Sequence, residues 1–198
     1  MFIQVIQGPC SRQDEMRSAM EQWEAERAPD VVGWLGGTYG FTDDGMFVAV
    51  VRFESEEMAR SNSDSREQSA WWERTRALFD AEPEFHDCTD VTLALDGGSD
   101  DAGFVQVIQG RAVDPDRLRA MMTDTRQMQE ERPDILGATL AIADDGTFTE
   151  TVAFTDEAAA REGEKKEMPA EMREQMMAAM DDVRYLDLHQ PWFASRMG

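Results

Sequence analysis

The stretch Phe2-Ile3-Gln4-Val5-Ile6-Gln7-Gly8 recurs as Phe104-Val105-Gln106-Val107-Ile108-Gln109-Gly110, with six of the seven positions identical. The patterns that follow each copy also recur in the same order, which indicates a duplicated domain. We therefore predict a first repeat over 1–95, a linker over 96–103 that is rich in Gly, Ser and Asp, and a second repeat over 104–198.

The composition limits the cell compartment and the partners. The chain has 198 residues, 41% of them hydrophobic, and a formal net charge of −22. Such acidity repels phosphate backbones and anionic lipid surfaces. No apolar run approaches the roughly 20 residues of a membrane span, and no basic segment with a cleavage pattern precedes Phe2. We expect a cytoplasmic protein that binds neither nucleic acid nor membranes.

Each repeat shows the same order of elements. In the first, strands are predicted over 2–7, 31–41, 46–53 and 85–95, with a helix over 12–27 and a longer one over about 67–80. In the second, strands are predicted over 104–109, 135–143, 147–154 and 183–189, with a helix after Asp114-Pro115 and a helical stretch over 156–180. The fold class is therefore α+β, with two ferredoxin-like βαββαβ repeats.

Short signals support these boundaries. Ser11, Ser55 and Ser65 are candidate helix caps, and Ser65 with Gln68 matches a capping box. Asp44-Gly45 is a hairpin turn. Four glycines in the strand over 31–41 predict a bulge or a backbone that another group approaches closely.

The first strand of each repeat is apolar on both faces, as strands buried on both sides are. Helices can cover only one face of such a sheet, so a second copy must cover the other. The paired unit resembles the dimeric α/β-barrel superfamily, and within it the antibiotic-biosynthesis-monooxygenase-like domains, over about 2–95 and 104–193. The resemblance implies two repeats packed sheet to sheet as an intrachain pseudo-dimer, hence a monomer that could also form a homodimer.

The resemblance also implies a ligand pocket between the second helix and the sheet. Domains of this group often carry a Trp on that helix, and Trp71 or Trp72 matches it. Asn62 matches a polar anchor, and Arg66 can hold a carboxylate or enolate by two hydrogen bonds. The alternatives are core packing for the tryptophans and loop capping with solvent exposure for Asn62 and Arg66.

Further polar groups complete the candidate site. Gln4, or Gln106 in the second repeat, matches a strand amide that reaches the ligand in haem-degrading relatives, although a bond to a neighbouring group is equally simple. Those relatives carry their axial His on the second helix, and residues 67–80 contain none. His86 is more plausible as a proton shuttle than as a partner of Cys88.

No metal and no cofactor are expected. Two cysteines and two histidines are too few for a four-ligand zinc site. Cys10 follows the end of the first strand and Cys88 is near the start of the fourth, an expected antiparallel neighbour, so the two could lie close. We predict free thiols because cytoplasmic proteins are kept reduced.

Three functions remain open. The first is a cofactor-independent oxygenase acting on a small hydrophobic or aromatic compound, with catalytic Asn62, Arg66, Trp72 and His86. Its ligand would bind Gln4, Trp34, Tyr39 and Trp71. The second is a non-catalytic module that binds a small ligand. The third is a structural protein whose pockets are filled.

The repeats differ in their large side chains. Nine of the fourteen methionines follow residue 103, and Met168, Met172, Met176 and Met180 form a stripe expected to fill the core. We therefore expect the functional pocket in the first repeat.

Overall fold

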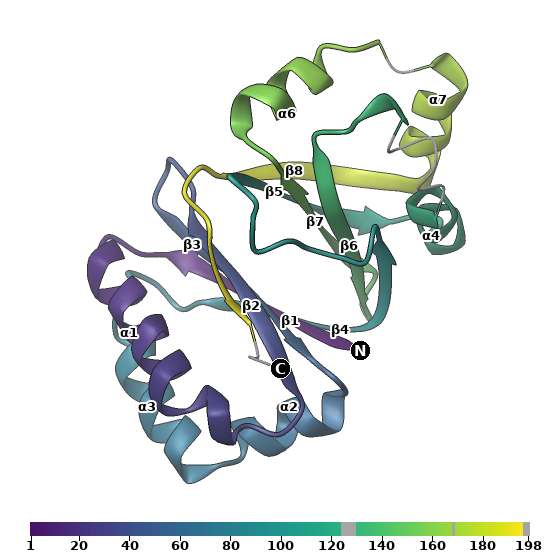
Figure 1. Cartoon of the computed structure of the whole chain (residues 1–198). Coiled ribbons are helices and arrows are strands. Elements are labelled where there is room, and N and C mark those ends of the chain that lie inside the picture. Colours follow the sequence, from purple (N-terminus) through teal and green to yellow (C-terminus); the bar gives the residue numbers. More distant parts are fainter. Residues whose placement is uncertain (124–129, 168, 196–198) are drawn as a thin grey trace. The chain divides into compact units, whose positions relative to one another are not determined.

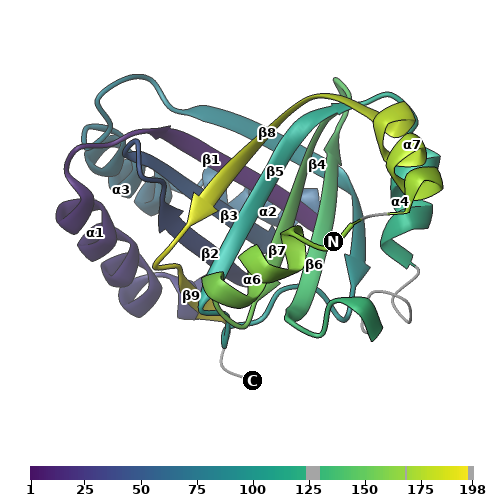
Figure 2. The same cartoon turned by 90° about the horizontal axis from the view of Figure 1, so that it is seen from above.

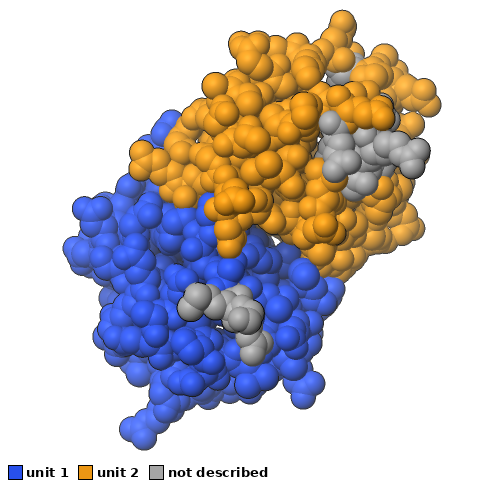
Figure 3. All heavy atoms as spheres, in the orientation of Figure 1, with its two compact units in different colours: residues 1–89, 192–198 blue, residues 90–191 orange. Residues whose placement is uncertain are grey.

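The computed structural model describes residues 1–123, 130–167 and 169–195. The chain forms two compact units, coloured separately in Figure 3. Unit 1 comprises residues 1–89 and 192–198, and unit 2 comprises residues 90–191. Unit 1 is therefore discontinuous in sequence, and the compact units do not have the same boundaries as the repeats.

Unit 1 follows the predicted βαββαβ order (Figure 1). Its strands are β1 (Phe2–Pro9), β2 (Trp34–Phe41), β3 (Met46–Phe53), β4 (Glu84–Ala94), whose last residues belong to unit 2, and β9 (Trp192–Ser195). Its helices are α1 (Gln13–Glu26), the 3₁₀ helix η1 (Ala28–Asp30), α2 (Glu56–Ser63) and α3 (Arg66–Arg76).

The unit 1 sheet has the strand order β4-β1-β3-β2-β9, and each of these neighbouring strand pairs is antiparallel. Helices α1, α2 and α3 cover one face of it (Figure 1). Val5 pairs with Val50 on β3 and His86 on β4, so these three side chains share the face opposite to that of Gln4 and Ile6.

Local signals in unit 1 are mostly confirmed. Gly45 has a φ of +81° in the β2–β3 hairpin turn, and the Ser55 hydroxyl caps α2. Ser65 caps α3, since its Oγ accepts a hydrogen bond from the Gln68 backbone N–H. The prediction that Ser11 caps α1 is wrong, because its hydroxyl and backbone N–H both bind the Asp80 carboxylate.

The glycines of β2 have two separate uses. The pairing with β3 shifts register between Trp34 and Gly36, which confirms the predicted bulge. Gly37 leaves room for a side chain: a Cβ added there would lie 2.1 Å from the hydroxyl oxygen of Tyr39. The close approach predicted for this strand therefore comes from Tyr39 itself.

The helix-covered face holds an aromatic core. Trp23 meets Trp34 edge to face, with ring centroids 5.4 Å apart. β9, which the sequence did not predict, brings Trp192 to this core, where it stacks on Tyr39 at 5.6 Å. The five tryptophans of the chain therefore all belong to unit 1.

Unit 2 repeats the order, as Figure 2 shows from above. Its strands are β5 (Phe104–Ala112), β6 (Ile135–Ala143), β7 (Thr147–Phe154) and β8 (Met180–Leu188). Its described helices include α4 (Pro115–Thr123), α6 (Glu157–Glu164) and α7 (Ala170–Ala179). The strand order is β8-β5-β7-β6, with β4 next to β6.

The methionine stripe fills the unit 2 core only in small part, since Met180 is partly buried and packs against that core. Met168 lies outside the described residues. Met172 and Met176 on α7 are only partly buried, and the buried residue of that helix is Ala179. The core is built mainly from other apolar side chains, among them Phe104, Leu118, Leu140 and Phe148. The cap before α4 is confirmed, because Asp114 accepts a hydrogen bond from the Arg117 backbone N–H.

Both cysteines are buried, and neither forms a disulfide, in line with the predicted thiols. Cys88 pairs with Ile3 near the start of β1, whereas Cys10 follows its end. The two cysteines therefore lie near opposite ends of β1 and not close together. The reason is that β4 already begins at Glu84, opposite Gln7, so Cys88 lies four residues further along. Among the described residues, no helix is long and apolar enough to cross a membrane.

Candidate functional site

A cavity of about 60 Å³ lies in unit 1 between the sheet and the helices. Its floor comes from the helix-covered face of β1, β2 and β3, including Ile6, Ala49 and Val51. Residues of α2 and α3 form the opposite side. Side chains alternate between the two faces of a strand, and these lie on the face that the helices cover. The predicted sheet-and-helix arrangement therefore also determines where the cavity lies.

Tryptophans and phenylalanines form the walls. The Trp72 ring lies 5.3 Å from Phe85, edge to face, and 6.3 Å from Phe79, measured between ring centroids. Trp71 lies 6.2 Å from Trp72 and from Trp23 on α1. Because indole rings have few rotatable bonds, they provide flat apolar surface suited to a planar ligand.

Six polar side chains belong to the cavity lining: Gln4, Tyr39, Asn62, Ser63, Gln68 and Thr75. The Gln4 amide donates to the Asp87 carboxylate at 2.8 Å, which fixes it toward β4. Within the described part of the chain, the Tyr39 hydroxyl and the Asn62 side-chain amide have no hydrogen-bond partner. Tyr39 is buried, and buried polar groups normally have partners, whereas Asn62 is only partly buried. Both groups are available to a ligand.

Gln68 has a role that the capping-box interpretation missed. Its side-chain oxygen accepts a hydrogen bond of 2.7 Å from the Trp23 indole N–H instead of returning to the Ser65 backbone. That contact leaves the Gln68 Nε2 as a further donor beside the cavity. The spacing was a usable signal, since Gln68 precedes Trp71 and Trp72 by three and four residues and so shares their helix face.

Tyr39 acts as a hydrogen-bond donor at neutral pH. Burial raises the pKa of its hydroxyl well above the usual value, and nearby Arg52 offsets this only in part. The phenol therefore stays protonated.

Three predicted site residues lie elsewhere. Arg66 is exposed on the first turn of α3, and His86 lies on the sheet face opposite to the cavity, 3.5 Å from the Gln7 amide. Trp34 is 2% exposed within the core, and its indole nitrogen has no hydrogen-bond partner in the part of the chain that the structure describes. The structure thus gathers Gln4, Tyr39, Asn62, Trp71 and Trp72 around one cavity and places these three outside it.

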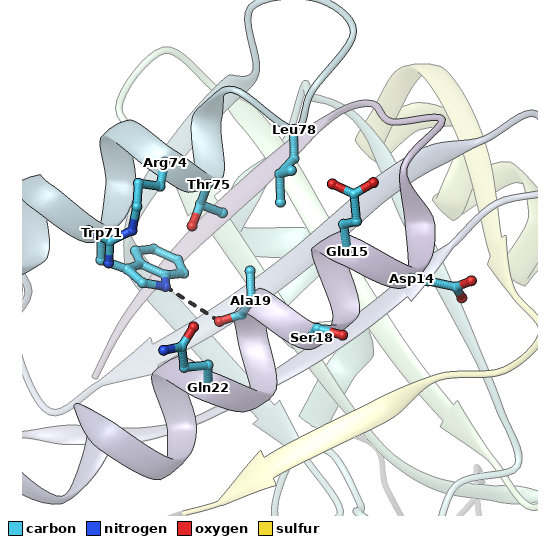
Figure 4. Close-up of a pocket in the computed structure, with 9 residues that line it drawn as sticks. All are labelled: Asp14, Glu15, Ser18, Ala19, Gln22, Trp71, Arg74, Thr75 and Leu78. Carbon is cyan, nitrogen blue, oxygen red and sulfur yellow. Dashed lines mark hydrogen bonds between the residues drawn. The ribbon is translucent and has the colours of Figure 1, made fainter.

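A second hollow, a groove of about 450 Å³, lies between α1 and α3. Figure 4 shows Trp71 and Arg74 at one end, with Asp14 and Glu15 toward the other. Trp71 and Thr75 line both the groove and the cavity. The Trp71 indole N–H donates to the Ala19 backbone carbonyl at 3.4 Å across the groove.

The cavity lining carries no side chain that ionises near neutral pH. Among the described residues, no group of three His, Cys, Asp or Glu side chains could hold a metal ion. The unit 2 counterpart of Gln4 is also engaged, since Gln106 donates to Asp187 at 2.9 Å and Glu164 at 3.3 Å. The cavity can therefore bind, orient and donate hydrogen bonds, but its own side chains are poor general bases.

The chain matches no known protein-family model, and no curated protein is similar to it in sequence. Solved structures are similar over nearly the full length. A "putative monooxygenase" from Lactobacillus acidophilus has a TM-score of 0.73 at 12% identity, with 99% of this chain and 97% of that chain covered. An anthrone oxidase-like protein has a TM-score of 0.71 at 8% identity, with coverages of 98% and 92%.

A ferredoxin-fold protein from Listeria monocytogenes, described as related to antibiotic biosynthesis monooxygenases, gives a TM-score of 0.51 at 10% identity, covering 95% of this chain and 94% of that one. The chain therefore shares the fold of these solved structures, as two ferredoxin-like repeats in one polypeptide. At these identities the likeness establishes the fold alone.

Proposed function

We propose that unit 1 is a cofactor-independent oxygenase that binds a small aromatic compound with an oxygen substituent. The proposal rests on the cavity walled by Trp71 and Trp72. In it, the Tyr39 hydroxyl and the Asn62 side-chain amide have no hydrogen-bond partner among the described residues. Apolar walls with a few placed polar groups are typical of small-molecule sites.

The chemistry follows from the donors. Without a cofactor, the substrate must supply electrons to O₂, and it does so most readily as an enolate or phenolate. Donors from Tyr39, Asn62 and Gln68 would stabilise that oxyanion. Because the cavity lining lacks a base, water takes the proton, and the protein contributes by holding the anion and its orientation.

Anthrone is a suitable probe because one similar structure is named for an anthrone oxidase-like protein. Loss of a proton from its CH₂ group gives an enolate. Reaction with O₂ then oxidises that carbon to a carbonyl, so that anthrone and O₂ give anthraquinone and water. The four electrons that O₂ accepts come from the substrate.

The second candidate is a module that binds the same compounds without turnover. The neutral lining favours it, since no side chain in the cavity can accept a proton near neutral pH. Oxygen consumption separates the two candidates.

We expect Trp72→Ala to weaken anthrone binding at least about tenfold, or about 1.4 kcal/mol, because it removes one aromatic wall. Binding is measured anaerobically by tryptophan fluorescence, and turnover by oxygen uptake and anthraquinone absorbance above the uncatalysed rate. Arg66→Ala is the matched control on α3, because Arg66 is exposed and outside the cavity.

Binding with accelerated oxygen uptake supports the oxygenase, and binding alone supports the module. An affinity that Trp72→Ala leaves unchanged contradicts the assignment of either function to this cavity.

A further inference from the structure

The cavity is too small for the ligand class proposed above. Its volume is about 60 Å³, whereas an apolar cavity that accepts benzene measures about 150 Å³. A wall must therefore move before even one aromatic ring can enter. The groove between α1 and α3, at about 450 Å³, is within the size range of small-molecule sites.

Trp71 is the wall best placed to move. It lines both hollows, so displacement of its indole would join them. It is only partly buried, and its one hydrogen bond, to the Ala19 carbonyl, is long at 3.4 Å. Trp72 is held between Phe79 and Phe85, and the strand residues are fixed by the sheet. Thr75, the other shared residue, is small and 2% exposed.

The groove also has a polar gradient. Arg74 lies at the Trp71 end and has no hydrogen-bond or ion-pair partner among the described residues. Asp14 and Glu15 lie toward the far end, as Figure 4 shows. Electron-rich oxygen is therefore favoured beside Arg74 and disfavoured near the two carboxylates.

We propose that Trp71 is a movable partition, and that the ligand of unit 1 is an elongated aromatic compound that spans both hollows. One ring occupies the cavity under Trp72, and an oxygen-bearing end lies beside Arg74 in the groove. The ligand class rests on the proposed function. The movement of Trp71 rests on volumes and contacts alone, and it sets the length of ligand that the site accepts.

Access is tested with fluorobenzene, a single ring whose binding requires no turnover, followed by ¹⁹F NMR exchange. If the open state is populated at about a tenth or less, Trp71→Ala raises the association rate at least about tenfold over the unaltered protein. Trp71→Phe, which keeps part of the wall, gives an intermediate rate. Arg66→Ala is again the control and leaves the rate unchanged.

Equal association rates for the unaltered protein and Trp71→Ala would overturn the partition. So would a folded Trp71→Ala variant that does not bind fluorobenzene. If Trp71→Ala does not fold, as judged by circular dichroism, Trp71→Phe decides by the same comparison. Anthrone turnover tests the oxygenase proposal, and the fluorobenzene association rate tests the movement of Trp71. Either proposal can therefore fail without the other.

Discussion

The two units differ in charge at one equivalent position on their third strands. In unit 1, Ala49 pairs with Ile6 and Tyr39 and forms part of the cavity floor. In unit 2, Glu150 takes that place, paired with Ile108 and Leu140. Burial raises the pKa of Glu150 to about 7, and its carboxyl has no hydrogen bond or ion pair with the described residues. Unit 1 thus has a neutral residue at this position, while unit 2 has a carboxyl that burial destabilises when charged.

A second difference lies on β2 and β6. Unit 1 has Gly37 and, two residues later, Tyr39, whereas unit 2 has Ala138 and, two residues later, Leu140. Both strands carry a bulge at the same place, between Trp34 and Gly36 and between Ile135 and Gly137. The same bulged backbone therefore accommodates two residue pairs. In unit 1, Gly37 leaves room for the Tyr39 side chain, and in unit 2, Ala138 stands two residues before the shorter Leu140.

The largest expected effect comes from replacing Glu150 with Leu. The folded-state pKa of about 7 lies above the ordinary 4.5, so the folded protein binds more protons between these values. Unfolding free energy therefore falls as pH rises from about 5 to 7 and is level above, by about 3 kcal/mol in total. Glu150→Leu should remove this loss and be more stable at pH 8.

The measurement is urea unfolding at several pH values by far-UV circular dichroism. Because the tryptophans belong to unit 1, the transition without a tryptophan signal is assigned to unit 2. Glu171→Gln, on the exposed side of α7, serves as control. A pH dependence equal in Glu150→Leu and the unaltered protein would show that the Glu150 carboxyl is solvated.

The next effect comes from making unit 1 resemble unit 2. Gly37→Ala places a Cβ 2.1 Å from the Tyr39 hydroxyl oxygen and should destabilise unit 1 by about 1–3 kcal/mol through overpacking. Adding Tyr39→Leu removes the clash, so the double variant should be more stable than the sum of the single changes predicts. Urea unfolding followed by tryptophan fluorescence tests this, and simple additivity would refute the coupling.

The smallest effect concerns Met176. Because this side chain is only partly buried, Met176→Ala should cost unit 2 about 1 kcal/mol, less than the 2–5 kcal/mol of a fully buried methionine. Anthrone binding should not change. A loss of binding in Met176→Ala with retention in Trp72→Ala would move the functional pocket to unit 2.

The duplication made most of the fold predictable, because identical strand starts and two Asp-Gly turns fix the order of elements. The expectation that Trp71 or Trp72 lines a pocket came from the resemblance to monooxygenase-like domains, not from the duplication, and it did not include Gln68. Side-chain direction was harder. His86 was assigned to the cavity from its residue type, but its face depends on the pairing of β4 with β1, which no local pattern reveals.

Two further features were not predicted: β9, which has no local sequence signal, and the buried position of Glu150, which was overlooked. β9 has four residues and no hairpin partner beside it in sequence, so its pairing with β2 is a long-range effect. Glu150 was visible as a charged residue in the apolar segment Thr147–Phe154. Aligning that segment with Met46–Phe53 places it opposite Ala49.

The pairing of β9 with β2 has a consequence for how the protein is made. Unit 1 acquires its edge strand only after the whole of unit 2 has left the ribosome. Until then the outer edge of β2 is open, and Tyr39 lacks the ring of Trp192 that stacks on it. An unpaired strand edge is a template for association with other chains. A fragment that stops at residue 95 contains every strand and helix of the first repeat but lacks β9, and it should aggregate through the open edge of β2.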